Sequence, residues 1–523
     1  MAVAGFSFLA ALLIAAFLGL NGGIALFCCA VVFAVASLIL LNKQWGKRLA
    51  IVGLSAACAC GVFLAATTLE IRKTSSLDEK TGVVTGEITN IVKRGSSTGY
   101  TLRTSKVDLP RAPQRLELVF YPYRTADLRL HDVIEVEMEL SVRPRNAYLT
   151  ETSGVRVLGL QSGEIKILAP EKRSFWYYLH KVKSRMQAGV NPYVDTEVEA
   201  ITKGVVFGED EGIDYTTQLV WSRAGISHLF SASGMHLAIL SQTLMLLLGC
   251  LRVPKRASAG IVMGFVLLFM ALLDFRMSIL RAGIVSLCYY GGKLIRRDAD
   301  SLNSMGLAAI IILLPNPFAI FDLSFLYSYF SSLGIILLAG RMERAIFERF
   351  GVKSKLWQWV FGCFCVSLSA NLFILPLNLL FSDEFSVVGL LVNVLLAPYI
   401  QVMIPLGMFC YLIGAVPLFA WLAQAGCWLL SLIIRTVCDA AGWLIRLPYA
   451  YLPAGYGFLR IWLAASLLIA AAAWLLWRLR KAPEGESPVL RKRLGSQLTG
   501  LCAALCALVL LTGICADTFL PRR

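Results

Sequence analysis

Charged residues are scarce in this sequence of 523 residues. Asp, Glu, Lys and Arg make up 16% of it and hydrophobic residues 57%, whereas a typical soluble protein is about 25% charged and about 45–50% apolar. This composition excludes an ordinary soluble protein. Apolar runs of bilayer length, roughly 17 residues or more, recur along most of the chain. The sequence therefore predicts a polytopic α-helical membrane protein.

Histidine is rarer than any charged residue, and two common catalytic motifs are missing. The only histidines are His131, His180, His228 and His236. The sequence has no His-Glu-x-x-His, the motif of zinc proteases, and no Gly-x-x-x-x-Gly-Lys-Ser/Thr, the phosphate-binding loop of ATPases. We therefore expect no metal, no cofactor and no ATPase activity, and we expect that the chain is not an enzyme.

Cysteine is absent from the one long polar block of the chain, residues 70–165. All 14 cysteines lie in apolar segments. A disulfide framework is therefore excluded for the polar block, and the apolar cysteines are expected to act as small packing residues.

Thirteen apolar segments can be counted, which we interpret as about 11–13 membrane spans. An Asn21-Gly-Gly turn separates the first two segments, and Pro398 and Pro405 favour a broken or re-entrant element in another. The segments are 5–20, 24–41, 49–69, 224–251, 257–275, 277–292, 303–321, 324–340, 356–381, 385–413, 418–445, 458–477 and 498–516.

Short loops between these segments carry much of the Lys and Arg. Lys43, Lys47 and Arg48 lie between the second and third segments, and further basic groups follow at 252–256, 293–297, 341–355 and 478–493. Because positively charged loops stay in the cytoplasm, we expect a cytoplasmic N-terminus and an extracytoplasmic block at 70–165. The same rule explains much of the net charge of +16 without nucleic acid.

Composition shifts divide the chain into five parts. The polar block shows alternating or β-branched stretches at 83–92, 100–106, 115–121, 132–142 and 147–158, which predict a small β-barrel, with an oligonucleotide/oligosaccharide-binding (OB) fold as one candidate. An amphipathic helix follows from residue 172. The predicted domains are N-terminal transmembrane helices 1–69, the OB-like β-domain 70–165, an interfacial helical connector 166–222, a transmembrane core 223–480, and a basic loop with a final transmembrane helix 481–523.

Basic and aromatic residues of the polar block are candidates for a binding site. Together they predict a face of the kind that binds single-stranded nucleic acid, and an ordinary solvated surface is the alternative. These residues are Lys93, Arg94, Arg103, Lys106 and Tyr121.

The stretch His228–His236 places polar side chains within apolar sequence. His228 and His236 flank Ser231, Ser233 and Gly234. Such groups at membrane depth normally face a protein interior or a water-filled cavity, and the Ser-Ala-Ser-Gly run favours a break in the helix. Three interpretations fit: buried histidines bonded across a helix interface, the polar lining of a translocation path, or a membrane serine hydrolase with Ser233 and a histidine base.

Two further polar residues, Arg281 and Asn393, lie in predicted spans. Arg281 is the strongest candidate for a path-lining cation, and its alternatives are an ion pair with Asp274 or Asp322 and snorkelling to the interface. Asn393 lines the same cavity or serves as an interhelical hydrogen-bond partner.

Five stretches together resemble the ComEC-type DNA-internalisation competence proteins. The first is Gly225-Ile-Ser-His228-Leu-Phe-Ser-Ala-Ser233-Gly234-Met-His236, and the others occur in the family's order. Asp322 stands where Gln is usual, and Ser-Ala-Ser-Gly replaces the commoner Ser-Ile-Ser-Gly. The other four stretches are Lys203-Gly-Val-Val-Phe-Gly208-Glu209, Arg281-Ala282, Leu314-Pro315-Asn-Pro317 through Phe325, and Val392-Asn393 through Pro398.

The resemblance implies a bacterial inner-membrane channel that passes single-stranded DNA into the cytoplasm. The path would be lined by His228, Ser231, Ser233, Gly234, His236, Arg281, Asp322 and Asn393. Many members carry a further metallo-β-lactamase-like domain, whose His-x-His-x-Asp-His motif this sequence lacks. We therefore expect a DNA receptor, a separate nuclease and a cytoplasmic motor as partners, besides the lipid bilayer, with a homo-oligomer also open. The alternatives are an intramembrane serine hydrolase at Ser233 with His228 or His236, and a transporter of another substrate.

Overall fold

The computed structural model divides the chain into two compact units. One comprises Met1–Glu209, Ser231–Tyr329 and Ile404–Leu430, and the other comprises Asp210–Phe230, Phe330–Met403 and Ser431–Arg523. The structure describes residues 1–38, 44–74, 77–94, 97–109, 116–123, 128–142, 157–168, 175–209, 212–230, 233–382, 384–448 and 450–453.

Two long helices open the first unit. Helix α1 (Ala2–Leu38) is unbroken in backbone and packs against α2 (Gln44–Thr74). The backbones approach so closely at Gly53 that an added Cβ would lie 2.8 Å from Ala34 Cα. The turn expected at Asn21-Gly-Gly is therefore wrong. Glycine costs only about 1 kcal/mol in a helix, and here Gly23 lies against Leu64 of α2.

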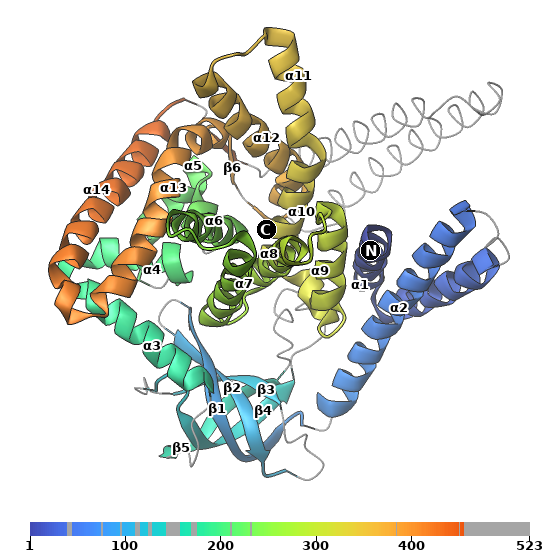
Figure 1. Ribbon diagram of the computed structural model, residues 1–523. Coiled ribbons are helices and arrows are strands. Elements are labelled where there is room, and N and C mark those ends of the chain that lie inside the picture. The colour runs from blue at the N-terminus through green and yellow to red at the C-terminus, as the bar shows by residue number, and fades with distance from the viewer. Residues whose placement is uncertain are drawn as a thin grey trace, which may run out of the picture. The chain divides into compact units, whose positions relative to one another are not determined.

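Five strands follow and close into a barrel (Figure 1). They pair in the order β1-β2-β3-β5-β4, with β1 also bonded to β4. The β3–β5 pair is parallel and the other pairs are antiparallel. The strands are β1 (Lys80–Arg94), β2 (Ser97–Val107), β3 (Glu117–Tyr121), β4 (Val133–Val142) and β5 (Val157–Leu168).

Alternation along each strand builds the barrel core. On β4 the side chains of Ile134, Val136, Met138 and Leu140 are buried, while the glutamates between them face outward. The predicted small barrel is confirmed, but its fifth strand was expected at 147–158 and lies at Val157–Leu168. A register shift against β4 between Val136 and Met138 interrupts the alternation that would have marked this strand. Residues 143–156 lie outside the described residues.

Three short helices follow the barrel in the sequence. Helix α3 (Phe175–Val190) exposes Phe175, Tyr178 and Val182, as an interfacial helix would. The carboxylates of Asp195 and Asp214 cap α4 (Thr196–Phe207) and α5 (Tyr215–Ala224) by accepting backbone N–H groups. Between α3 and α4 lies a 3-10 helix at Asn191–Tyr193.

Apolar helices form the rest of the first unit. Helices α6 (Gly234–Cys250), α7 (Lys255–Leu272) and α8 (Met277–Ile295) pack against one another. Helix α9 (Ser301–Leu313) packs against α1, where Gly5 and the backbone of Gly306 lie too close together for an added Cβ. A 3-10 helix at Pro317–Phe321 precedes α10 (Leu323–Gly334).

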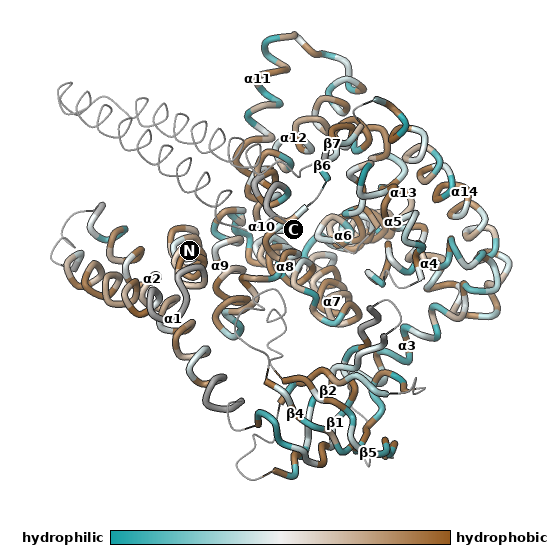
Figure 2. Tube along the Cα trace, turned by 180° about the vertical axis from the view of Figure 1, so that it is seen from behind, coloured by the Kyte–Doolittle hydropathy of each residue, from teal (hydrophilic) through white to brown (hydrophobic). Residues whose placement is uncertain are grey.

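One helix runs further than the sequence indicated. Helix α10 continues through a π-helical turn, Ile335–Ala339, into α11 (Gly340–Phe350). The basic loop was expected to begin at residue 341, and this is wrong because the charged residues of α11 are themselves helix formers. Figure 2 shows the contrast between α11, which carries much hydrophilic colour, and the mostly hydrophobic α2.

The chain then continues with α12 (Lys355–Phe381), β6 (Glu384–Ser386), α13 (Gly389–Gly414), a 3-10 helix at Pro417–Phe419, α14 (Ala420–Leu444) and β7 (Tyr451–Pro453). The break expected at Pro398 and Pro405 is wrong, since α13 is continuous through both. Proline removes one N–H donor, and membrane helices tolerate this loss where neighbours satisfy the freed carbonyl.

Six helices among the described residues are long and apolar enough to cross a bilayer. Shorter apolar helices, including Gly234–Cys250 and Ser301–Leu313, add to them. The protein is therefore a mostly helical, multi-pass membrane protein with one closed β-barrel. The predicted spans 458–477 and 498–516 lie outside the described residues.

Candidate functional site

The stretch from His228 to His236 is an interruption between helices. His228 is exposed on a 3-10 helix, Ser227–Leu229, in the second unit. Helix α6 begins only at Gly234, so the predicted segment 224–251 is not one continuous helix, and the break expected at the Ser-Ala-Ser-Gly run is confirmed. Ser233 is the extended residue that precedes α6. Ser231 lies outside the described residues.

Ser233 and His236 bond to each other at the start of α6. The backbone N–H of Ser233 donates to His236 Nδ1 at 3.1 Å, and Ser233 Oγ lies 2.9 Å from the same nitrogen. His236 thus occupies the place that Glu or Gln takes in a capping box. Because Nδ1 accepts a hydrogen bond, we assign the proton of the neutral ring to Nε2.

Arg281 of α8 lies against this helix start. Its side chain is buried, with 8% of the residue exposed, and its Nε donates to Ser328 Oγ of α10 at 2.9 Å. A Cβ on Gly234 would lie 2.7 Å from Arg281 Nη2 and 2.9 Å from Ala282 Cβ. Only glycine therefore leaves room for the guanidinium here.

We call Ser233, Gly234, His236, Arg281 and Ser328 the helix-start cluster. All five belong to the first unit. The guanidinium and the positive end of the α6 dipole lie together, and this combination favours an anionic group such as a phosphate. Sequence reasoning found four members and missed Ser328, since a serine on an apolar helix has no distinguishing pattern.

Two other predicted site residues have local roles. The Asp322 carboxylate accepts the N–H groups of Ser324 and Phe325 at 2.7 and 3.2 Å and so caps α10. Asn393 of α13 donates from Nδ2 to Ser367 Oγ of α12 at 3.2 Å. Its Oδ1 is buried and has no hydrogen-bond partner among the described residues. Asn393 belongs to the second unit.

The Gly208-Glu209 segment after α4 is held from two sides. Glu209 accepts from buried Lys183 at 2.6 Å and from Gln187 at 2.7 Å, both on α3. The Gly208 carbonyl accepts from Arg276 Nη1. Glu209 is therefore held in an ion pair with Lys183. Asp210 and Glu211 lie outside the described residues.

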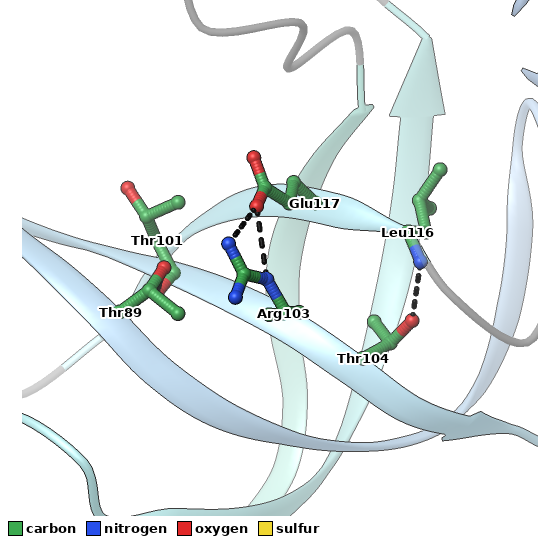
Figure 3. Close-up of polar contacts among 6 residues, drawn as sticks. All are labelled: Thr89, Thr101, Arg103, Thr104, Leu116 and Glu117. Atoms are coloured by element: carbon green, nitrogen blue, oxygen red, sulfur yellow. Dashed lines mark hydrogen bonds and ion pairs between the residues drawn. The ribbon is translucent and has the colours of Figure 1, made fainter. Parts of the chain in front are cut away.

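The predicted basic face of the barrel is partly neutralised. Arg103 of β2 donates from Nε and Nη2 to one oxygen of Glu117 on β3, at 3.0 and 2.7 Å (Figure 3). On its other side, Arg103 is opposite Glu87 of β1. Lys106 is exposed, and the Tyr121 ring lies over Gly99. Lys93 and Arg94 end β1, and their side chains lie outside the description.

Two histidines connect the barrel to α3. His131 Nδ1 lies 2.7 Å from Glu87 Oε1, and its ring meets that of His180 edge to face, with 5.8 Å between centroids. Burial, followed by the charges of Lys183 and His131, holds the pKa of His180 below its ordinary value.

No group of three or more His, Cys, Asp or Glu side chains is placed to share a metal ion within the residues that the structure describes. The hydrogen-bond donors of the helix-start cluster are a guanidinium, hydroxyls and backbone N–H groups.

Comparison with known proteins gives the family. ComE operon protein 3 of Bacillus subtilis (strain 168) is 28% identical over 246 residues, which cover 47% of this chain and 29% of the relative. The aligned part is thus less than a third of that protein. No solved structure matches. Residues 205–481, more than half of the chain, match the Competence protein family. The match includes the helix-start cluster, and the chain belongs to this ComEC-type competence family.

Proposed function

We propose that the protein acts in DNA uptake during competence and passes one strand of DNA through the membrane into the cytoplasm. Competence is the state in which bacteria take up DNA, and the family match covers residues 205–481. The observation that carries the proposal is a buried cation, Arg281, at the glycine-lined start of α6 within that region.

The chemistry of a DNA strand fits such a cluster. Each nucleotide brings one phosphate, so a conduit needs cations and hydrogen-bond donors rather than groups that read bases. The apolar surroundings strengthen the attraction of Arg281 for an anion, since water screens it less. Gly234 keeps the helix backbone close to the guanidinium, and Ser328 fixes its direction. The cluster would therefore offer a passing phosphate one oriented cation.

We propose further that the barrel is an OB-like domain on the extracytoplasmic side. Its closed five-strand order and its parallel β3–β5 pair support that identity. OB folds bind oligonucleotides on strands 2 and 3 and on the loop between strands 1 and 2. Here Lys93 and Arg94 flank that loop, and Tyr121 lies on the neighbouring strand β3. This face would guide DNA toward the membrane part.

The proposal requires partners. A DNA receptor would deliver duplex DNA, a separate nuclease would degrade the strand that is not transported, and a cytoplasmic motor would pull the other. A homo-oligomer is also compatible with a path for DNA.

A transformation assay tests the function. A strain from which the chromosomal gene has been deleted carries either the wild-type gene on a vector or the empty vector. Both strains are given labelled duplex DNA with a selectable marker. We expect import only with the wild type, measured as nuclease-resistant label and as transformants. Normal import with the empty vector would overturn the proposal. Import of another solute instead would favour a transporter of a different substrate.

A serine hydrolase remains the second candidate, because Ser233 Oγ lies 2.9 Å from His236 Nδ1, within reach for a nucleophile and its base. The same nitrogen accepts the Ser233 N–H, which fits a helix cap equally well. A fluorophosphonate probe separates the two functions. Labelling of the wild type that is lost in Ser233→Ala would support the hydrolase, and an unlabelled wild type would exclude it.

A further inference from the structure

A second arginine, Arg223, forms a two-pronged contact in the second unit. Its Nε donates to Glu384 Oε2 and its Nη2 to Glu384 Oε1, both at 2.9 Å. Two parallel N–H···O bonds of this kind are the arrangement in which a guanidinium binds either a carboxylate or a phosphate. The contact joins residues 161 positions apart.

The plane of the guanidinium is fixed from one side by an aromatic ring. Arg223 Cζ lies 4.4 Å from the centroid of Tyr451, which is within the range of a cation–π contact. Strands β6 and β7 pair so that Ser386 is opposite Tyr451 and Glu384 is opposite Pro453. Because side chains alternate along a strand, Glu384, Ser386 and Tyr451 share one face of this two-stranded sheet.

The backbone around Arg223 is held equally firmly. Helix α5 ends at Gly225, whose φ of +73° favours glycine and whose N–H bonds the Ser222 carbonyl. A Cβ on Gly225 would lie 3.0 Å from Ser386 Oγ and from Gly389 Cα. The guanidinium is therefore presented by rigid elements rather than by a loose loop.

The pair is also accessible, since the Arg223 and Glu384 side chains are 29% and 30% exposed. Both side chains are open to solvent, where dissolved ions screen and compete with an ion pair. A phosphodiester can therefore replace the carboxylate on the same two N–H groups. Five residues further on lies exposed His228, within the stretch that resembles the family signature.

We propose that Arg223 and Tyr451 form a binding site for a phosphodiester of the DNA strand, with Glu384 occupying the guanidinium when no strand is present. The site rests on the proposed function and adds a position to it. Arg223 binds the phosphate, the Tyr451 ring stabilises the guanidinium and offers a face to a base, and Glu384 competes with the phosphate. Because Glu384 competes for the guanidinium, the site favours a DNA strand, whose many phosphates make further contacts, over a single phosphate.

Direct binding tests the site. The full-length protein in nanodiscs of zwitterionic phosphatidylcholine is titrated with a fluorescent oligothymidylate, and with the same sequence on an uncharged methylphosphonate backbone. We expect Arg223→Lys, which keeps the charge but loses the fork, to bind about 10-fold more weakly. Glu384→Gln removes the competing charge and should bind about 3-fold more tightly. The methylphosphonate strand should not respond to either substitution.

Two controls make the outcomes distinct. Glu117→Gln frees the exposed Arg103 of the barrel in the same way and should change binding less than Glu384→Gln. Nanodiscs with phosphatidylglycerol test whether a lipid head group is the phosphodiester instead. If Glu384→Gln and Arg223→Lys leave oligothymidylate binding unchanged in neutral nanodiscs and change only the binding of phosphatidylglycerol, the DNA site is overturned in favour of lipid.

Failure of the site and failure of the function give different results. If the wild type neither binds the oligothymidylate nor restores transformation, the proposed function fails. If the wild type does both and Arg223→Lys and Glu384→Gln match it, only the site is overturned. A gain of binding in Glu384→Gln cannot come from misfolding, so it supports the site even where Arg223→Lys folds poorly.

Discussion

The helix-start cluster and the outer face of the barrel were both expected to meet DNA, and they are built differently. In the cluster, the Arg281 side chain is buried and bonds Ser328, and Ser233 bonds His236. On the barrel, the Arg103 side chain is 58% exposed and shares its contact with a single Glu117 oxygen.

The two regions differ in whether protein groups or water molecules form the hydrogen bonds of the polar side chains. A buried polar group without a partner costs several kcal/mol, so each member of the cluster has a fixed place. Water can satisfy Arg103 and Lys106 wherever they point, so their positions are set only loosely. We therefore expect single substitutions to have large effects in the cluster and small effects on the barrel.

The largest effect is expected at Gly234. A Cβ there would lie 2.7 Å from Arg281 Nη2 and 2.9 Å from Ala282 Cβ, so Gly234→Ala must displace the guanidinium or move α6 away from Ala282 of α8, at about 1–3 kcal/mol. We expect transformation to fall at least about 10-fold. Gly249→Ala on the same helix is the matched control, because nothing lies within 4 Å of its Cβ position. Equal loss in both variants would break the comparison.

Arg281 comes next. Arg281→Gln keeps a donor for Ser328 but loses the charge, and we expect a loss of import of about 10-fold with near-normal protein abundance on immunoblots. Ser328→Ala removes one hydrogen bond and should cost only about 1 kcal/mol. If import falls because the protein itself disappears from the membrane, Arg281 serves structure and not the path.

Substitutions of His236 distinguish a helix-capping residue from a catalytic base. His236→Gln restores the usual capping-box residue and should keep transformation within about 3-fold, whereas His236→Leu loses the cap at about 1 kcal/mol. A base for Ser233 could not be replaced by glutamine. Complete loss of function in His236→Gln would therefore favour the hydrolase and weaken the structural description of the cluster.

The contact between barrel and α3 predicts a smaller, pH-dependent effect. The pKa of His180 is lowered by burial first, so the folded state disfavours the charged ring. Stability is then lost as the pH falls from the ordinary histidine value, about 6.5, through the lowered one. Melting temperatures of wild type and His180→Gln should converge above that value and diverge below it, with the variant less sensitive to acid.

The smallest effect is expected on the barrel. Arg103→Ser removes an exposed pair worth about 0.2–1 kcal/mol, so melting temperature and transformation should change little. The salt dependence of DNA binding should weaken by at most one phosphate contact. A loss of import as large as that of Gly234→Ala would show that the barrel face is as strictly built as the cluster.

Much of the fold could be predicted because its patterns are local. Apolar length indicated the long helices, and the alternation around Ile134 and Val136 indicated β4. The errors arose where packing overrides local signals: α1 runs through Gly23 because it packs on α2, and α13 runs through Pro398 and Pro405. The register shift opposite Met138 hid the position of β5.

The candidate site was predictable only in part. Gly234 and Arg281 stand out in apolar sequence, yet nothing in the sequence says that they touch, nor that Ser328 receives the arginine. The Arg223–Glu384 contact joins residues 161 positions apart. Each of these charged residues lies in a sequence segment that looks like an ordinary loop. Their contact is therefore visible only in the three-dimensional structure.

The parallel pairing of β3 with β5 has a consequence for the order of folding. β5 is the last strand of the barrel to be synthesised, and it bonds both β3 and β4. Until residues 157–168 have left the ribosome, β3 and β4 each keep one unpaired edge, which is the kind of surface that other chains add to. Barrel closure is therefore a late, non-local step. A truncation before Val157 is expected to leave an open sheet that aggregates and is sensitive to proteases. A truncation after Leu168 is expected to leave a closed barrel.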